Sequence, residues 1–147
     1  MSFGGNFAAM SGLSGIVHAA VDLGGPAVGA FEAANVQKLP YGMHDILGNA
    51  MHRDHSPTLD ERSSGLGQLN RENLLAQQHN SAMLVVNGAD DYFIPQSDTL
   101  VFQGRPKTEV HLIEGTGHVA MSKAPEVVPK IIDWLRTHFA EPAAAIV

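Results

Sequence analysis

Two short apolar runs in the second half of the chain, each leading into a glycine-containing turn, limit the possible folds most strongly. The runs cover residues 82–87 and 109–114, and each is typical of a buried strand. The turn after the first run contains Asp91, and the turn after the second run ends at His118. In open α/β sheets, functional sites form beyond the carboxyl ends of parallel strands. We therefore expect the carboxylate of Asp91 and the imidazole of His118 to lie close together.

The rest of the chain alternates between segments typical of strands and segments typical of helices. Residues 16–23 form a third apolar run and are predicted to be a strand. Apolar residues recur at helical spacing near the end of the chain. Pro125 and Pro129 place the start of that helix near Glu126, because proline is tolerated only in the first turn. This alternation predicts an α/β fold, with a parallel half-sheet of about three strands flanked by helices.

A small helical insertion is predicted between the first two strands, over approximately residues 28–65. Residues 40–42, Pro-Tyr-Gly, separate its two helical patches. Helices are expected at residues 30–38, 43–51, 70–77 and 97–102. Ser97 or Asp98 is predicted to cap the last of these, because short polar side chains accept hydrogen bonds from the first N–H groups of a helix.

Composition argues against several classes of protein and site. The 147 residues suit one domain, and a formal net charge of -6 without a basic stripe argues against a nucleic-acid partner. The absence of cysteine excludes disulfides and thiolate metal ligands. No apolar run approaches the roughly 18 residues of a membrane span, and the first residues lack the features of a signal peptide. We therefore expect a cytoplasmic protein that has no membrane partner.

The order Ser2, Asp91 and His118, within this pattern of strands and helices, resembles the C-terminal half of an α/β-hydrolase-fold serine hydrolase. The resemblance is firm over residues 82–139, good over residues 2–26, and extends to nearly the whole chain. Within the superfamily, the chain is similar to esterases related to the fermentation/respiration switch protein. It is also similar to carbon–carbon bond hydrolases that act on diketone-like substrates.

The first residues of the chain match part of the motif that carries the nucleophile in this fold. Met1-Ser2-Phe3-Gly4 fits the last four positions of G-x-S-x-G, a strained strand-to-helix turn that exposes the serine hydroxyl. The resemblance implies that Ser2 is the nucleophile and that the backbone N–H of Phe3 is one oxyanion donor. The second donor would come from a loop after an earlier strand of the family fold.

The resemblance also implies an acid and a base for Ser2. Asp91 would orient His118 and stabilise its protonated form, and His118 would act as general base and general acid. Family spacing selects Asp91 over Asp90, because the acid lies three residues after a glycine and four before a proline. We expect Asp90 to hydrogen-bond the turn backbone instead. Four residues flank the acid and the base: Tyr92, Phe93, Val119 and Met121. They either line an apolar substrate pocket or pack beneath the loops.

Two other histidines have the spacing of metal ligands. His52 and His55 flank Asp54, and imidazoles one helical turn apart can share a metal. A third ligand is not evident in the sequence, so a solvated loop is the favoured interpretation and no metal is expected. His111 lies within the second apolar run and is expected to be structural.

The family pattern places several strands before the nucleophile, whereas this sequence starts at the nucleophile turn. We therefore expect a fragment of a longer enzyme, preceded in frame by a glycine codon, rather than a short product that has lost catalysis. The strand at residues 16–23 would then form an unpaired sheet edge, and such an edge favours self-association.

The leading functional hypothesis is a serine hydrolase that cleaves a carboxylic ester or a related acyl compound through an acyl-enzyme. Carbon–carbon bond hydrolysis by the same residues is the nearest alternative. A catalytically inactive relic or interaction module is the alternative from a different class. The expected partner is a small-molecule ester or acyl substrate, and no cofactor is expected.

Overall fold

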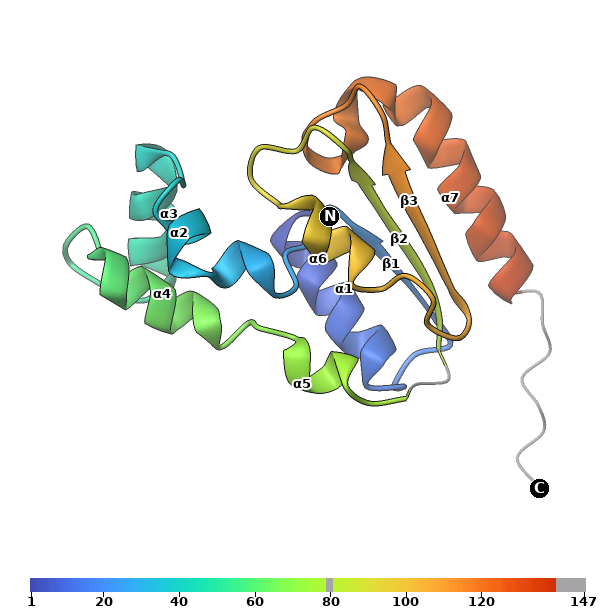
Figure 1. Ribbon diagram of the computed structural model, residues 1–147, viewed down its shortest axis with the longest axis horizontal. Helices are drawn as coiled ribbons and strands as arrows, with labels where there is room; N and C mark the ends of the chain where they lie inside the picture. The colour runs from blue at the N-terminus through green and yellow to red at the C-terminus, as the bar shows by residue number, and fades with distance from the viewer. Residues whose placement is uncertain (79–80, 140–147) are drawn as a thin grey trace.

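A parallel three-stranded sheet lies between helices in the computed structural model, which describes residues 1–78 and 81–139 (Figure 1). The strands, in their spatial order, are β1 (Ala19–Leu23), β2 (Ala82–Gly88) and β3 (Thr108–Ile113). Both pairings are parallel. The carboxyl ends of all three strands therefore lie at one end of the sheet, and the predicted α/β class is confirmed.

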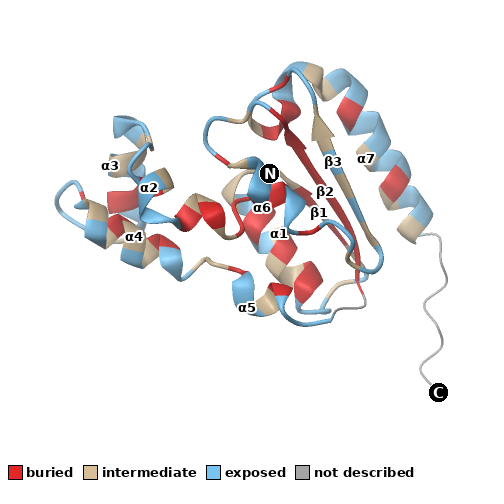
Figure 2. Cartoon of the chain, in the orientation of Figure 1, coloured by how far each residue is buried: buried red, intermediate tan, exposed pale blue. Residues whose placement is uncertain are grey.

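β2 is the centre of the sheet, and each of its residues is buried. Successive side chains of a strand point to opposite faces, so Met83 packs on one face in the core beneath α1 (Phe3–Leu13). Val86 packs on the other face, in the core beneath α7 (Ala124–Phe139). Figure 2 shows β2 in red, with helices on either side that carry exposed residues. Burial on both faces explains the unbroken apolar run in the sequence.

β3 is an edge strand of this sheet, and the prediction that it is as buried as β2 was wrong. Its side chains alternate in burial, with Glu109 and His111 exposed. Glu109 Oε2 and His111 Nε2 lie 3.7 Å apart. The physical reason is that α7 leaves a groove beside β3, and both of these side chains line that groove.

Two element boundaries differ from the prediction. β1 begins at Ala19, and Ile16 is 73% exposed before the strand starts. α7 begins at Ala124, two residues earlier than predicted, so that Pro125 falls in the first turn and Pro129 lies inside the helix. Pro129 is exposed, and water there can replace the hydrogen bond that proline cannot donate. No helix among residues 1–78 and 81–139 combines the length and the hydrophobicity needed to cross a membrane.

The helix α6 (Gln96–Leu100) begins without the predicted side-chain cap. Pro95 occupies the N-cap position, and no side chain caps the helix there. The buried Asp98 carboxylate instead accepts hydrogen bonds from the backbone N–H groups of residues 27–30, at distances of 2.6 to 3.3 Å. Asp98 therefore joins α6 to the segment that leads from β1 into the insertion, and its carboxylate is not available as a cap.

The insertion forms a small helical unit that projects from the sheet in Figure 1 and has its own apolar core. Its elements are η1 (Gly29–Phe31), α2 (Ala33–Val36), α3 (Tyr41–Ala50) and α4 (Leu59–Gly67). The buried residues of its core are Phe31, Val36, Leu47 and Leu66. Phe3, which follows Ser2, packs against this core and so connects the start of the chain to the insertion.

The helix α4 was missing from the sequence-based prediction. The Thr58 hydroxyl accepts a hydrogen bond from the Glu61 N–H at 3.3 Å, and the Glu61 carboxylate accepts one from the Thr58 N–H at 2.9 Å. These two bonds form a capping box, whose T-x-x-E spacing is visible in the sequence. The polar composition of the helix obscured this signal. The next helix, α5 (Glu72–Leu75), is shorter than the predicted one.

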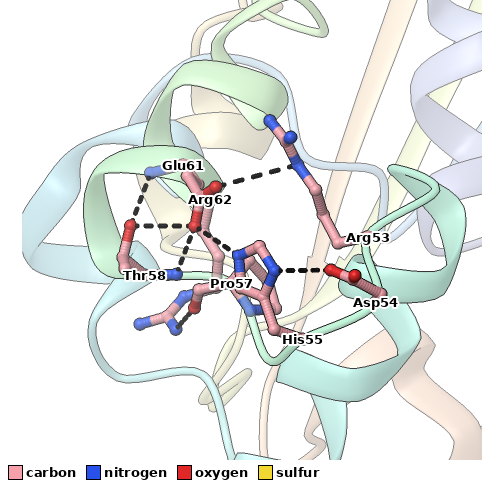
Figure 3. A network of polar contacts seen from close by, with 7 residues as sticks. All are labelled: Arg53, Asp54, His55, Pro57, Thr58, Glu61 and Arg62. Atoms are coloured by element: carbon pink, nitrogen blue, oxygen red, sulfur yellow. Dashed lines mark hydrogen bonds and ion pairs between the residues drawn. The ribbon is translucent and has the colours of Figure 1, made fainter.

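His55 lies between two carboxylates in the turn before α4 (Figure 3). His55 Nδ1 is 3.0 Å from Asp54 Oδ1, and His55 Nε2 is 3.3 Å from Glu61 Oε2. Hydrogen bonds with Asp54 and then with Glu61 raise the pKa of His55. No group of three or more histidine and acidic side chains in the described part of the chain could hold a metal ion.

We predict that Glu61→Gln lowers the pKa of His55 towards its ordinary value, because the substitution removes one of its two carboxylate partners. Protonated His55 stabilises the folded state below its unfolded pKa of about 6.5, and this contribution is lost as the pH rises through the folded-state pKa. NMR titration of the ring signals measures the change, with the exposed His18 as internal control. An unchanged His55 pKa in Glu61→Gln would contradict this account.

Asp22 is a buried acidic residue within β1. Its Oδ1 accepts a hydrogen bond from the Gly25 N–H at 2.8 Å, whereas its Oδ2 has no hydrogen-bond partner among the residues described. Burial raises the pKa of Asp22 to about 6. The folded state therefore binds a proton more tightly than the unfolded state, and stability falls as the pH rises from about 4 to about 6.

We predict that Asp22→Asn stabilises the protein at pH 7, by about 1–3 kcal/mol, because a shift of one pKa unit corresponds to about 1.4 kcal/mol. Urea unfolding at pH 5 and pH 7 measures the effect, and the gain should shrink at the lower pH. Asp98→Asn is the matched control and should destabilise at both pH values, because it removes a charged acceptor from four N–H groups. Lower stability of Asp22→Asn at pH 7 would refute the prediction.

Candidate active site

Ser2 occupies a strained turn at the start of α1, next to the carboxyl end of β1. Its φ of +53° and ψ of -132° lie in a region that residues with a side chain rarely adopt. The Ser2 N–H donates a hydrogen bond to the Leu23 carbonyl at 2.8 Å, and the Ser2 carbonyl accepts one from Gly5 at 2.7 Å. Gly5 permits close approach to Gly25, since a Cβ at Gly5 would lie 2.9 Å from the Gly25 Cα. These contacts hold the strained turn in place.

His118 lies between Ser2 and Asp91 and is within hydrogen-bond distance of both. Its Nε2 is 3.0 Å from Ser2 Oγ, and its Nδ1 is 2.7 Å from Asp91 Oδ2. The His118 side chain is 27% exposed, whereas that of Asp91 is 1% exposed. The structure thus brings together the three residues named from the sequence, in the order hydroxyl, imidazole and carboxylate.

The buried Asp91 carboxylate is surrounded by hydrogen-bond donors. Besides His118, it accepts bonds from Asn87 Nδ2 at 2.9 Å and from the backbone N–H groups of Phe93 and Ile94 at 2.8 and 3.2 Å. Burial acts to raise the pKa of Asp91, but these hydrogen bonds outweigh burial and lower it. Asp91 is therefore ionised at neutral pH. Asp90 is exposed, and its backbone N–H donates to the Thr116 carbonyl at 2.9 Å.

Asn87 is a residue of the site that sequence reasoning missed. Its Nδ2 donates to Asp91, and its Oδ1 accepts a hydrogen bond from the Val119 N–H at 3.0 Å. Val119 and Ala120 both have positive φ, at 55° and 49°, so the backbone after His118 is strained. Asn87 thus joins the loop that carries Asp91 (the acid loop) to the loop that carries His118 (the histidine loop). The available signal was a polar residue at the carboxyl end of an otherwise apolar strand.

Phe3 directly follows Ser2, at the sequence position expected to provide an oxyanion donor. Phe3 is the first residue of α1, and the first four N–H groups of a helix have no acceptor within the helix. Gly5 and Asn6 donate to the Ser2 carbonyl, which leaves the N–H groups of Phe3 and Gly4. The positive end of the helix dipole lies at the same place and favours negative charge.

The four candidate pocket residues occupy different environments. Tyr92 and Phe93 line a cavity of about 510 Å³, and the Phe93 ring lies edge-on to His118, with 5.6 Å between ring centroids. We call it the insertion cavity; the residues that line it are Asn35, Lys38, Leu39, Asp91, Tyr92, Phe93 and Pro95. Val119 is buried, and Met121 is 57% exposed; neither lines the insertion cavity.

Comparison with known proteins finds similarity at the level of solved structures. No protein-family model and no curated protein matches the chain. The chain is similar to 2,6-dihydroxy-pseudo-oxynicotine hydrolase, with a TM-score of 0.79, 17% identity, and coverage of 95% of this chain and 38% of that one. It is also similar to a meta-cleavage product hydrolase, with a TM-score of 0.57, 15% identity, and coverage of 96% and 63%.

A thermophilic esterase is similar as well, with a TM-score of 0.53, 16% identity, and coverage of 92% of this chain and 63% of that one. The chain therefore spans less than two thirds of the length of each of these enzymes. All three neighbours are α/β-hydrolase-fold enzymes. This chain therefore has part of the α/β-hydrolase fold that these longer enzymes share.

Proposed function

We propose that this chain carries the catalytic machinery of a serine hydrolase that acts on a carboxylic ester or a related acyl substrate. The observation that carries the proposal is the hydrogen-bond sequence from Ser2 Oγ through the His118 imidazole to Asp91. Three segments far apart in the chain supply these groups at one end of a parallel sheet. The fold shared with solved hydrolases, including an esterase, supports the same reading.

The geometry suits a two-step mechanism. In the first step, Ser2 Oγ attacks the ester carbonyl carbon while His118 Nε2 accepts the serine proton. The Phe3 N–H binds the oxyanion of the tetrahedral intermediate. This intermediate then collapses, the alcohol leaves with the proton from His118, and an acyl-enzyme remains. In the second step, His118 deprotonates a water molecule that attacks the acyl carbon, and Ser2 recovers its proton. Ionised Asp91 stabilises the imidazolium in both steps.

Carbon–carbon bond hydrolysis is the second candidate function, and the similarity to a meta-cleavage product hydrolase favours it. In that case the leaving group would be a carbanion equivalent instead of an alcohol, and it would take up the proton from His118. An inactive relic is less favoured, because the hydrogen bonds of all three catalytic candidates are intact and Ser2 has the strained backbone of an exposed nucleophile.

We predict that a fluorophosphonate probe labels Ser2 covalently, because His118 can accept the proton that the hydroxyl loses. Mass spectrometry of the labelled protein locates the adduct. Ser2→Ala should abolish labelling, whereas the control Ser11→Ala should retain it, since the Ser11 hydroxyl donates to the carbonyl of Phe7 within α1 and not to a residue of the candidate active site. A folded protein that remains unlabelled at Ser2 would rule the proposed function out.

We predict that Asp91→Asn reduces kcat for a p-nitrophenyl ester by about 10⁴-fold, the loss that the same change causes in a serine protease. The reason is that the amide no longer holds the required tautomer of His118. Steady-state kinetics and circular dichroism distinguish this loss from unfolding. A kcat within tenfold of the unmodified chain would show that Asp91 does not support the histidine.

We predict that Asn87→Ala lowers kcat by roughly tenfold and leaves KM nearly unchanged. The substitution removes one hydrogen bond to Asp91 and one from the Val119 N–H, and the loss of a buried hydrogen bond costs about 1–3 kcal/mol. The exposed Asn73→Ala is the matched control and should have no effect. An unchanged kcat in Asn87→Ala would mean that the strained histidine loop keeps its place without Asn87.

A further inference from the structure

The insertion cavity has a polar wall that the proposed chemistry does not use. Its volume of about 510 Å³ falls within the usual range for small-molecule sites, about 300–1,000 Å³. One wall comes from residues 35–39 of the insertion and the other from residues 91–95 of the acid loop. The cavity therefore lies where a substrate portion could extend from the candidate active site towards the insertion.

The wall formed by the acid loop is largely aromatic. The rings of Tyr92 and Phe93 lie edge to face, with 5.6 Å between centroids, and Phe93 lies edge-on to His118 at the same separation. Leu39 and Pro95 add apolar surface. An aromatic or alkyl group in the insertion cavity would thus contact the same ring that contacts the catalytic histidine.

The opposite wall carries an exposed cation, Lys38, which hydrogen-bonds the side chain of Asn35. Asn35 Nδ2 donates to the Gly29 carbonyl at 2.8 Å, which fixes the side-chain amide, and Asn35 Oδ1 accepts a hydrogen bond from Lys38 Nζ at 3.2 Å. An ammonium group has three donors, so two remain for a ligand. None of the ion pairs among residues 1–78 and 81–139 involves Lys38.

The nearby carboxylate of Asp91 does not neutralise Lys38, because Asp91 is buried and its acceptor positions are occupied by His118, Asn87 and two backbone N–H groups. The whole chain has a formal net charge of -6, with 9 lysines and arginines against 15 acidic residues. A lysine that has no acidic partner among the described residues and lies at a cavity wall therefore attracts anions locally, on a protein whose net charge otherwise repels them.

We propose that Lys38 binds a carboxylate of the substrate, and that the aromatic or alkyl part of the same molecule fills the insertion cavity. The substrate class is then an ester or related acyl compound that carries a second, free carboxylate. This inference rests on the proposed function for the reaction, but the binding of a carboxylate at Lys38 does not require turnover.

Isothermal titration calorimetry with benzoate and with its neutral analogue benzamide tests the binding directly. Benzoate should bind more tightly than benzamide by about 5- to 10-fold, the range expected for a hydrogen-bonded ion pair that is partly open to water. Lys38→Gln should abolish this preference, and Lys38→Arg should retain it. Lys130→Gln is the matched control, because it makes the same change in charge but lies in the groove between β3 and α7.

The inference would be overturned if benzoate does not bind, or if the two compounds bind equally well. It would also be overturned if the preference for benzoate survives Lys38→Gln or is lost in Lys130→Gln. A kinetic comparison separates this result from the fate of the proposed function. Lys38→Gln should raise KM for a p-nitrophenyl monoester of succinate and leave KM for p-nitrophenyl butyrate unchanged. If benzoate binding depends on Lys38 but fluorophosphonate does not label Ser2, the proposed hydrolase function is rejected and the carboxylate site is retained. If Ser2 is labelled but benzoate does not bind at Lys38, the hydrolase function is retained and the carboxylate site is rejected.

Discussion

The position of the His118 imidazole between a buried carboxylate and a serine hydroxyl is the constraint on which the rest of the site depends. The ring can meet both partners because β2 and β3 are parallel neighbours, with Gly88 in register with Ile113. The loops after these strands therefore leave the sheet side by side, and Asn87 connects them by hydrogen bonds to Asp91 and to the Val119 N–H. A change in strand register would separate the acid from the base.

Strained backbone occurs at the same end of the sheet. Ser2, Val119 and Ala120 lie there and have positive φ, and each such conformation costs on the order of 1–3 kcal/mol. His52 in the insertion and Lys107 before β3 are the other non-glycine residues with positive φ in the described part of the chain. The surrounding structure maintains them through specific bonds, including those from the Ser2 N–H to the Leu23 carbonyl and from the Val119 N–H to Asn87. Asp22, a carboxylate buried in β1 with an unpartnered oxygen among the described residues, adds a further cost nearby. Strain and buried charge at one place are typical of sites selected for chemistry rather than for stability.

The parts of this structure that could be predicted from the sequence are those encoded by local pattern. An apolar run followed by a glycine turn identifies a strand and the ionisable residue beyond it, which is why Asp91 and His118 were found. The hydrogen bond from the Val119 N–H to Asn87 and those to Asp98 could not be read in the same way, because the bonded residues lie 32 and about 70 residues apart in the sequence. The exposed face of β3 depends on how α7 packs, and α4 was hidden by its polar composition despite its capping box.

The most direct test of the account is the hydrogen bond between His118 Nδ1 and Asp91, observed as the imidazole Nδ1–H signal in the proton NMR spectrum. The account predicts a strongly downfield, slowly exchanging His118 proton that persists in Ser2→Ala and disappears in Asp91→Ala. A His118 Nδ1–H that exchanges as rapidly as that of a free imidazole, in a protein that is otherwise folded, would contradict the central arrangement.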